Sequence, residues 1–309
     1  FLIGCWAISY LARGSSQEGD CLGFLLRPGL MVLFVVNFLE ELMKKLTEII
    51  KKIQAVLAAP SEGRTRIING TDTTIERFPH MISLRGSSGG HSCGGSILSN
   101  YWILTAAHCV NPFTTPYLQT VQVGRTEISR PADSSVYEIL EVIVHPGYNE
   151  SYSFVNDIAV LKLKQPLAFG PTIQPVKLPA PCFEVEDQDD MGVTLTGWGL
   201  NNDGVVPSIL QKVDYYVVPN AECDLIHVPK IYPSQICAKY PGGGKGQCNG
   251  DSGGPLLHNG VQVGIVSWSI KPCTIAPYPG VLTKVSHYID FIYKNTNLQG
   301  AGEESVQCS

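Results

Sequence analysis

One short stretch, residues 246–255 (GQCNGDSGGP), places a single serine, Ser252, among several glycines. A serine hydroxyl becomes a useful nucleophile when a base takes its proton and hydrogen-bond donors bind the oxyanion that forms. Flanking glycines let backbone N–H groups approach the hydroxyl, which is one way to build those donors. A glycine-rich surface turn is the alternative interpretation, so the decision depends on whether a base and an orienting acid exist elsewhere in the chain.

Two other stretches supply these groups. His108 lies in residues 105–109 (TAAHC), directly after an apolar run, and Asp157 lies at the start of another apolar run, residues 156–161 (NDIAVL). Each residue alone has a plain structural explanation: a structural histidine, a capping aspartate and a turn serine. Together, in the order His, Asp, Ser, they provide the base, the orienting acid and the nucleophile of a hydrolytic triad.

Short β-branched and aromatic runs, separated by glycine- and proline-rich turns, must position these residues. Strands are expected at residues 81–85, 92–98, 101–105, 118–124, 136–144, 158–163, 192–198, 210–218, 261–268 and 280–285. Helical periodicity after residue 66 is confined to residues 286–295, which predict a C-terminal helix. Alternating βαβ units are absent from the pattern, so antiparallel β-barrels are favoured over a parallel sheet.

The composition indicates a secreted globular protein. The chain has 309 residues, of which 44% are hydrophobic, enough to bury a sizeable core. Its formal net charge of −5 argues against nucleic acid as a partner, because nucleic-acid binding needs a basic surface. Ten cysteines favour an oxidising compartment, and the sequons at Asn69 and Asn149 suit a secreted glycoprotein.

Residues 1–66 differ from the rest and are interpreted as a targeting segment and pro-segment. Residues 29–39 form an apolar run of the length found in signal peptides and too short to span a bilayer. Residues 40–58 predict an amphipathic helix that either lies on a membrane surface or packs on its own domain, and we favour the second. Residues 61–66 are polar and basic, as in an exposed linker open to proteolysis.

Motifs spread over the remaining chain resemble the trypsin/chymotrypsin family of serine endopeptidases. They read IING, SCGGSIL, LTAAHC, NDIAVLKL, LTGWG, GDSGGPL, VSWS and PGVLTKV. The resemblance runs from Ile67 to about Asn297 and implies a catalytic domain over residues 67–297, with a tail at 298–309. It implies an all-β fold of two antiparallel six-stranded β-barrels and a short C-terminal helix.

The resemblance also implies the role of each catalytic residue. Ser252 is the expected nucleophile, His108 the general base and then acid, and Asp157 the group that holds the imidazole in the right tautomer. The backbone N–H groups of Gly250 and Ser252 are the expected oxyanion hole.

Activation by cleavage is a further implication of the family. A trypsin-like protease is expected to cut after Arg66, so that the new ammonium of Ile67 pairs with Asp251. Such a buried ion pair is costly unless both members are present, so its formation acts as a switch from a zymogen. His91 corresponds to a position at which relatives stabilise the zymogen, and a plain core histidine is the alternative.

The residues at the specificity-pocket positions are Gly246, Ser269 and Gly280, while Ser267 and Trp268 correspond to the strand that pairs with the substrate backbone. None of the three pocket residues is acidic, and burying a substrate ammonium without a counter-charge is costly. We therefore expect a deep pocket for large apolar or aromatic side chains, with an elastase-like preference for smaller ones as the alternative. The enzyme should then be unable to cut after its own arginine.

The resemblance implies three disulfides, namely Cys93–Cys109, Cys223–Cys237 and Cys248–Cys273. It does not pair the other four cysteines, Cys5, Cys21, Cys182 and Cys308. Arg125 occupies the position where the family's calcium loop has a carboxylate, which argues against a calcium site. No metal or cofactor is expected.

The expected partners are protein and peptide substrates, an activating trypsin-like protease and proteinaceous inhibitors, and the expected state is a monomer with no membrane anchor. Two other hypotheses remain open. One is a regulatory protease of a cascade whose front segment stays tethered through Cys182. The other is an inactive homologue that acts as a binding module.

Overall fold

The computed structural model describes residues 39–47, 67–128, 133–181, 183–184, 191–228 and 230–298. The chain divides into two compact units, Phe1–Gly63 and Arg64–Ser309. In the first unit residues 39–47 are helical and exposed. Residues 40–47 lie within the predicted amphipathic helix, and Leu39 is the last residue of the signal-like run. Residues 29–38, residues 48–58 and Arg66 lie outside the described residues.

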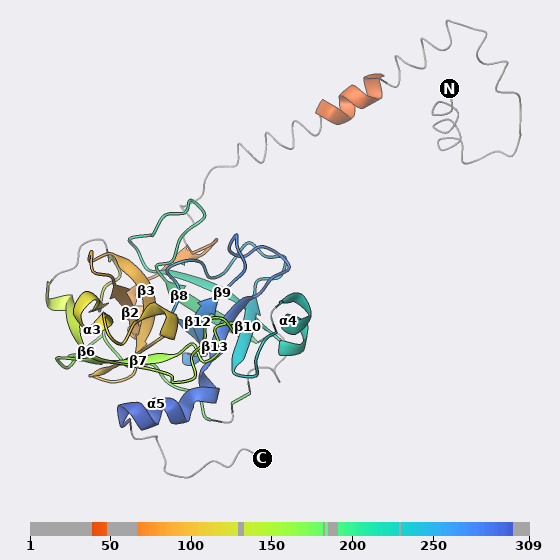
Figure 1. Cartoon of the computed structure of the whole chain (residues 1–309). Coiled ribbons are helices and arrows are strands. Elements are labelled where there is room, and N and C mark those ends of the chain that lie inside the picture. Colours follow the sequence, from red (N-terminus) through yellow and green to blue (C-terminus); the bar gives the residue numbers. More distant parts are fainter. Residues whose placement is uncertain are drawn as a thin grey trace, which may run out of the picture. The chain divides into compact units, whose positions relative to one another are not determined.

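The second unit contains two antiparallel β-barrels. In the first barrel, which is closed, the strand order is β2-β3-β4-β7-β6-β5. Its strands are β2 (Met81–Arg85), β3 (His91–Ile97), β4 (Trp102–Thr105), β5 (Thr120–Val123), β6 (Val136–Val144) and β7 (Ala159–Leu163). Figure 1 shows these strands, coloured orange to green, beside those of the second barrel, coloured teal to blue.

The second barrel follows the order β9-β10-β13-β12-β11-β8 and closes through the pairing of β8 with β9. Its strands are β8 (Gly192–Gly197), β9 (Gln211–Val218), β10 (Gln235–Lys239), β11 (Pro255–His258), β12 (Val261–Trp268) and β13 (Gly280–Lys284). A two-residue strand, β1 (Thr71–Asp72), adds to the outer edge of β9. The predicted fold of two six-stranded antiparallel barrels is confirmed.

Strand β9 shows how the sequence specifies a barrel wall. Val213, Tyr215 and Val217 are buried, whereas Asp214 and Tyr216 between them are exposed. This alternation is the two-residue period of a strand that has one face on the core. Tyr215 therefore points into the second barrel and Tyr216 points out of it.

Three strands were not predicted from the sequence: β1, β10 and β11. Strand β10 has one β-branched residue, Ile236, and forms because it pairs with both β9 and β13. Strand β11 begins with Pro255, which a strand tolerates at its first position. These strands depend on tertiary pairing that local propensity does not report.

The helices of this unit are short. They are α3 (Thr115–Leu118), α4 (Asn220–Ile226) and α5 (Ile289–Thr296), with 3-10 turns at η1 (Ile75–Arg77), η2 (Ala107–Cys109), η3 (Asp133–Ser135) and η4 (Val285–Tyr288). The predicted C-terminal helix is confirmed as α5, although its expected first turn is the 3-10 turn η4. In α5 the buried residues Ile289, Ile292 and Thr296 follow helical spacing, and Asn297 ends the helix in the left-handed conformation. Among the described residues, no helix is long and apolar enough to cross a membrane.

Candidate active site

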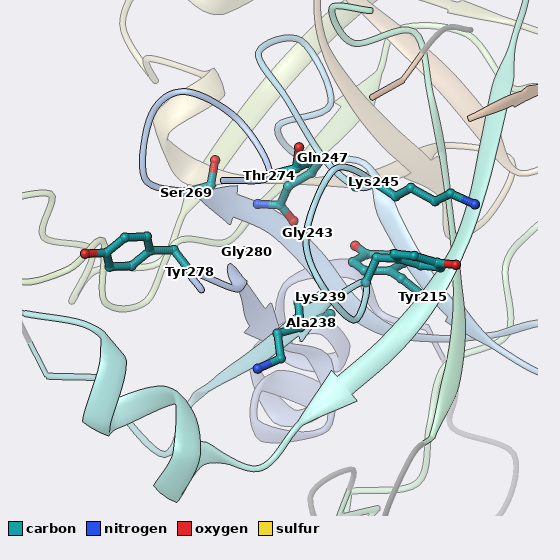
Figure 2. Close-up of a pocket in the computed structure, with 12 residues that line it drawn as sticks. Tyr215, Ala238, Lys239, Gly243, Lys245, Gln247, Ser269, Thr274, Tyr278 and Gly280 are labelled. Carbon is teal, nitrogen blue, oxygen red and sulfur yellow. The ribbon is translucent and has the colours of Figure 1, made fainter. Parts of the chain in front are cut away.

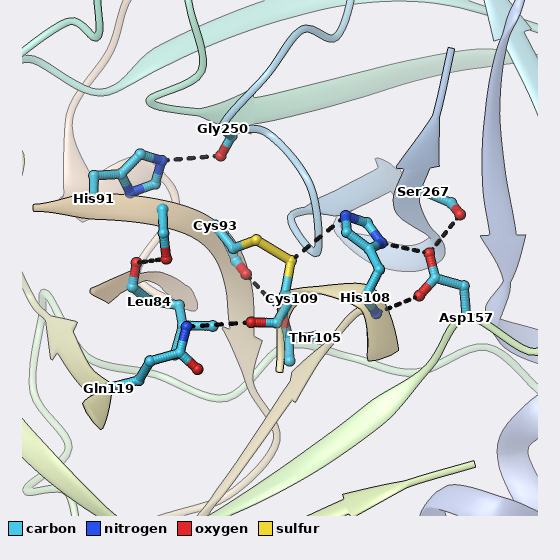
Figure 3. Close-up of a disulfide and its surroundings, with 12 residues drawn as sticks. Leu84, His91, Cys93, Thr105, His108, Cys109, Gln119, Asp157, Gly250 and Ser267 are labelled. Carbon is cyan, nitrogen blue, oxygen red and sulfur yellow. Dashed lines mark hydrogen bonds and ion pairs between the residues drawn. A yellow bond between two sulfur atoms is a disulfide. The ribbon is translucent and has the colours of Figure 1, made fainter. Parts of the chain in front are cut away.

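His108 and Asp157 are brought together by the pairing of two strands of the first barrel. His108 lies in η2, directly after β4, and Asp157 lies just before β7, whose Ala159 is opposite Thr105 of β4. The imidazole Nδ1 of His108 donates to Oδ2 of Asp157 at 2.7 Å, and the backbone N–H of His108 donates to Oδ1 at 2.9 Å. Figure 3 shows both contacts. With the proton on Nδ1, the other ring nitrogen of a neutral imidazole is free to accept one.

Asp157 is fully buried, and the second barrel stabilises it. The hydroxyl of Ser267 on β12 donates to Oδ2 at 2.5 Å, and the hydroxyl of Thr283 on β13 donates to the backbone carbonyl of Asp157 at 2.8 Å. A buried carboxylate is tolerated when hydrogen bonds replace its water. The sequence resemblance places Ser267 against the substrate backbone and gives no indication of this side-chain contact.

Ser252 is half-buried in the loop that precedes β11, and the loop packs against the strands that lead to His108. The carbonyl of Ser252 accepts from the N–H of Gly94 on β3 at 2.7 Å. Gly253 has a positive φ of 77°, and a Cβ there would lie 3.1 Å from the backbone nitrogen of Ala106. Within the described part of the chain, the Ser252 hydroxyl makes no hydrogen bond with His108. Such catalytic hydrogen bonds are often long or unformed without substrate.

The backbone amides of this loop fall into two groups. Those of Asp251, Gly253 and Gly254 donate to the carbonyls of Cys248, Val266 and Asp251, respectively. Those of Asn249, Gly250 and Ser252 donate to no group among the described residues. The N–H groups of Gly250 and Ser252 are therefore available to bind an oxyanion.

Asp251 is fully buried on the other side of the same loop. Its Oδ1 accepts from the N–H of Gly199 and its Oδ2 from the N–H of Cys248, each at 2.9 Å. A Cβ at Gly197 or Gly199 would overlap the carboxylate, so the two glycines of the LTGWG motif make room for it. The motif is visible in the sequence, but this role of its glycines is not.

The environment of Asp251 disfavours its charged form. Burial raises the pKa of Asp251 to about 7, and the two backbone hydrogen bonds and the charge of Lys271 offset only part of that effect. Within the described residues, no cationic side chain forms an ion pair with Asp251. Ile67, the residue that directly follows the expected cleavage point, is fully buried in the core of the second barrel.

His91 orients the peptide of Gly250. Its Nε2 lies 2.9 Å from the carbonyl oxygen of Gly250, and its Nδ1 lies 2.8 Å from the hydroxyl of Ser83. Burial lowers the pKa of His91 to about 4, so the ring is neutral near neutral pH. A neutral ring that donates from Nε2 and accepts at Nδ1 satisfies both partners.

The three pocket residues line one small cavity. Gly246, Ser269 and Gly280 surround it together with Gln247 and Tyr215, and no acidic residue is among the described residues that line it. Figure 2 shows this cavity with the Gln247 side chain next to Gly280. A Cβ at Gly280 would lie 2.6 Å from the side-chain Cδ of Gln247. The expected depth at Gly280 is therefore wrong, because the Gln247 carboxamide occupies the space that this glycine leaves.

Three disulfides connect Cys93 with Cys109, Cys223 with Cys237, and Cys248 with Cys273. The cysteines Cys5, Cys21, Cys182 and Cys308 lie outside the described residues. Cys93, Cys109 and His108 are close enough in space to resemble a metal-binding group. Because both sulfur atoms belong to one disulfide, neither is available as a thiolate ligand.

Comparisons with known proteins agree with this architecture. The chain matches the trypsin family over residues 67–292. It is 38% identical over 242 residues to the vitellin-degrading protease of Bombyx mori, which covers 77% of this chain and 88% of that protein. It is 36% identical over 256 residues to trypsin II-P29 of Gallus gallus, covering 81% of this chain and 97% of that protein. It is 38% identical over 230 residues to chymotrypsin-2 of Vespa crabro, covering 74% of this chain and 99% of that protein.

The fold and the site thus define a two-barrel hydrolase with a serine, a histidine and an aspartate at the junction of the barrels. The chain belongs to the trypsin family of serine proteases and is a serine endopeptidase.

Proposed function

We propose that Ser252, His108 and Asp157 hydrolyse peptide bonds through an acyl-enzyme. His108 takes the proton of the Ser252 hydroxyl as the oxygen attacks the peptide carbonyl, and then gives that proton to the leaving amine. Water deacylates the serine through the same base. The observation that carries this proposal is the 2.7 Å contact between His108 Nδ1 and Asp157 Oδ2, which leaves Nε2 without a proton and able to act as a base. The Cys109 sulfur lies 3.8 Å from Nε2, but it belongs to a disulfide and has no proton to donate.

The proposed oxyanion hole consists of the N–H groups of Gly250 and Ser252. Its support is that these two amides donate to no described group, whereas those of Asp251, Gly253 and Gly254 in the same loop do. Donors fixed before the reaction stabilise the developing negative charge without reorganisation, and loss of one costs on the order of 10²- to 10³-fold in kcat.

A fluorophosphonate probe tests the triad directly. The full-length chain, treated with trypsin, is expected to be labelled at Ser252, and Ser252→Ala is expected to abolish both labelling and peptide cleavage. A chain that stays unlabelled after complete processing would favour the alternative of an inactive homologue that only binds its partners.

We further propose that the protein is made as a zymogen that is activated by cleavage after Arg66. Asp251 supports this proposal, because it is a buried carboxylate with a raised pKa and no cationic partner among the described residues. A new ammonium at Ile67 would supply that partner, and the pairing would fix the loop that carries Gly250 and Ser252.

The proposed substrates have a large uncharged side chain before the scissile bond, with aromatic and apolar residues preferred. The support for an uncharged side chain is a cavity whose described lining contains no carboxylate to neutralise a substrate lysine or arginine. The preference for a large side chain comes from the chymotrypsin-like resemblance of the pocket positions. An elastase-like preference for smaller side chains is the second candidate, favoured by Ser269 at the cavity wall. A profile of kcat/KM against the residue before the scissile bond separates the two.

Secretion is also proposed, supported by the three disulfides and by the exposed sequon residues Asn69 and Asn149. We expect a monomer that proteinaceous inhibitors recognise. Non-reducing electrophoresis after activation tests the cascade alternative, because a front segment tethered through Cys182 would separate only on reduction.

A further inference from the structure

Gln247 is almost fully buried, with 4% of its surface exposed, yet its carboxamide is only half satisfied. The amide nitrogen donates to the backbone carbonyl of Trp268 at 3.0 Å. The amide oxygen is buried and has no hydrogen-bond partner among the described residues. Because a carbonyl such as that of Trp268 can only accept, the atom facing it must be the NH₂ group. The unpaired atom is therefore a hydrogen-bond acceptor.

A second unpaired group lines the same cavity. The hydroxyl of Tyr215 on β9 is buried and has no hydrogen-bond partner among the described residues. Burial and the nearby Asp251 raise the pKa of Tyr215, so this hydroxyl keeps its proton and can donate. A buried polar group without a partner is costly, and most folded proteins contain few of them. Two such groups at one cavity point to a ligand that satisfies both.

The cavity is small and uncharged at this point. Its volume is about 20 Å³, little more than one water molecule needs. Only the tip of a substrate side chain can therefore reach the space beside Gln247. The two lysines at the cavity are turned away in Figure 2: Lys239 forms an ion pair with Glu222 at 2.6 Å, and Lys245 lies over the ring of Tyr240.

We propose that Gln247 is a specificity-determining residue that selects, among uncharged side chains, those whose tip donates a hydrogen bond. The phenol of tyrosine and the carboxamide of glutamine or asparagine have this chemistry, since each has a donor for an acceptor such as Gln247 Oε1 and an acceptor for a donor such as the Tyr215 hydroxyl. Phenylalanine, leucine and methionine would bury both groups unsatisfied. This inference rests on the proposed function and specifies its substrates more closely.

Matched substrates test the proposal. Peptides that differ only in the residue before the scissile bond, Tyr against Phe and Gln against Met, are compared by kcat/KM with the activated protein. A site that hydrogen-bonds a substrate group discriminates strongly against the analogue that lacks it, so we expect a preference of at least about tenfold in one pair or both. A preference in the first pair alone identifies the phenol as the ligand, and one in the second pair alone identifies the carboxamide.

Variants of the cavity test the assignment to Gln247. Gln247→Met keeps the length of the side chain and removes the acceptor, so it should bring the preferred kcat/KM ratio close to one. Tyr215→Phe should lower the same ratio, whereas its matched control Tyr216→Phe, on the exposed face of β9, should not. The two variants are independent, so failure of one to fold leaves the other as the test.

Two results would overturn the proposal. The first is a wild-type enzyme that cleaves both members of each pair equally, as expected if water satisfied the two groups. The second is a preference that survives in both Gln247→Met and Tyr215→Phe. A protein that the fluorophosphonate probe labels but that shows either result disproves this inference alone, whereas an unlabelled and inactive protein disproves the proposed function with it.

Discussion

The hydroxyl of Ser267 donates to Asp157 through Oδ2, the same carboxylate oxygen that accepts from His108. Asp157 precedes a strand of the first barrel, whereas Ser267 lies on β12 of the second barrel. The orientation of the aspartate is thus determined by both barrels. A change that shifts one barrel against the other should therefore change the orientation of the His108 imidazole before it disturbs the packing of either barrel core.

Removal of this hydroxyl by Ser267→Ala should lower kcat with little change in KM. The variant keeps the backbone of β12, which is the part expected to pair with substrate, and loses a hydrogen bond to a buried carboxylate. Hydrogen bonds to charged groups contribute about 1.5–3 kcal/mol, so a reduction of roughly tenfold or more in kcat is expected. Steady-state kinetics and a thermal melt measure the two effects separately. Ser92→Ala is the control and should leave kcat unchanged, because among the described residues it removes a hydroxyl that donates to the Leu84 carbonyl alone.

Gly199→Ala should disable the site although it replaces no residue of the triad. A Cβ at this position would overlap the Asp251 carboxylate, so the carboxylate, its two backbone donors or both must move. Overpacking of this kind costs typically about 1–3 kcal/mol, and here it also displaces the loop that carries Ser252. Titration of active sites with the fluorophosphonate probe should show a large loss of reactive serine. Gly192→Ala, where a Cβ meets nothing within 4 Å, should behave like the wild type; equal loss in both variants would contradict the argument.

The stability of the uncleaved chain should depend on pH through Asp251. Its pKa is raised to about 7 in the folded chain and is about 4 in an unfolded one. Between these values the folded chain holds a proton that the unfolded chain has released, so the free energy of unfolding falls as the pH rises from about 4 to about 7. Pairing with the Ile67 ammonium would lower the pKa of Asp251 and remove this loss.

Cleavage should therefore raise the Tm more at pH values above about 7 than at pH values near 4. Calorimetry of cleaved and uncleaved Ser252→Ala protein measures this difference without self-digestion. His80 and His91 have their pKa lowered to about 4 by burial and favour stability at higher pH, but they are present in both forms and cancel in the comparison. An equal Tm increase at both pH values would show that the ammonium does not reach Asp251.

The sequence predicts the two-barrel fold and marks His108, Asp157 and Ser252, because these residues lie in long motifs of distinctive chemistry. It does not predict strand β10, whose residues have low strand propensity and rely on two neighbouring strands. Nor does it indicate that the Gln247 side chain turns toward Gly280, which changes the expected pocket. The conformation of a single buried side chain and its partners distant in sequence depend on the packed structure, which a local sequence pattern does not describe.

The uncleaved chain should be unable to activate itself. Cleavage after Arg66 requires a pocket that neutralises a guanidinium, and no carboxylate is among the described residues that line this cavity. Incubation of purified protein alone should yield no chain that begins at Ile67, whereas added trypsin should yield it together with activity. Arg66→Gln gives a sharp control, because trypsin can still cut after Arg64 but the new terminus then begins at Thr65 and cannot place an Ile67 ammonium at Asp251. Activity in that cleaved variant would disprove the role of the Ile67 terminus. Self-activation would be shown by an Ile67 terminus that forms when wild-type protein is incubated without trypsin and does not form in Ser252→Ala.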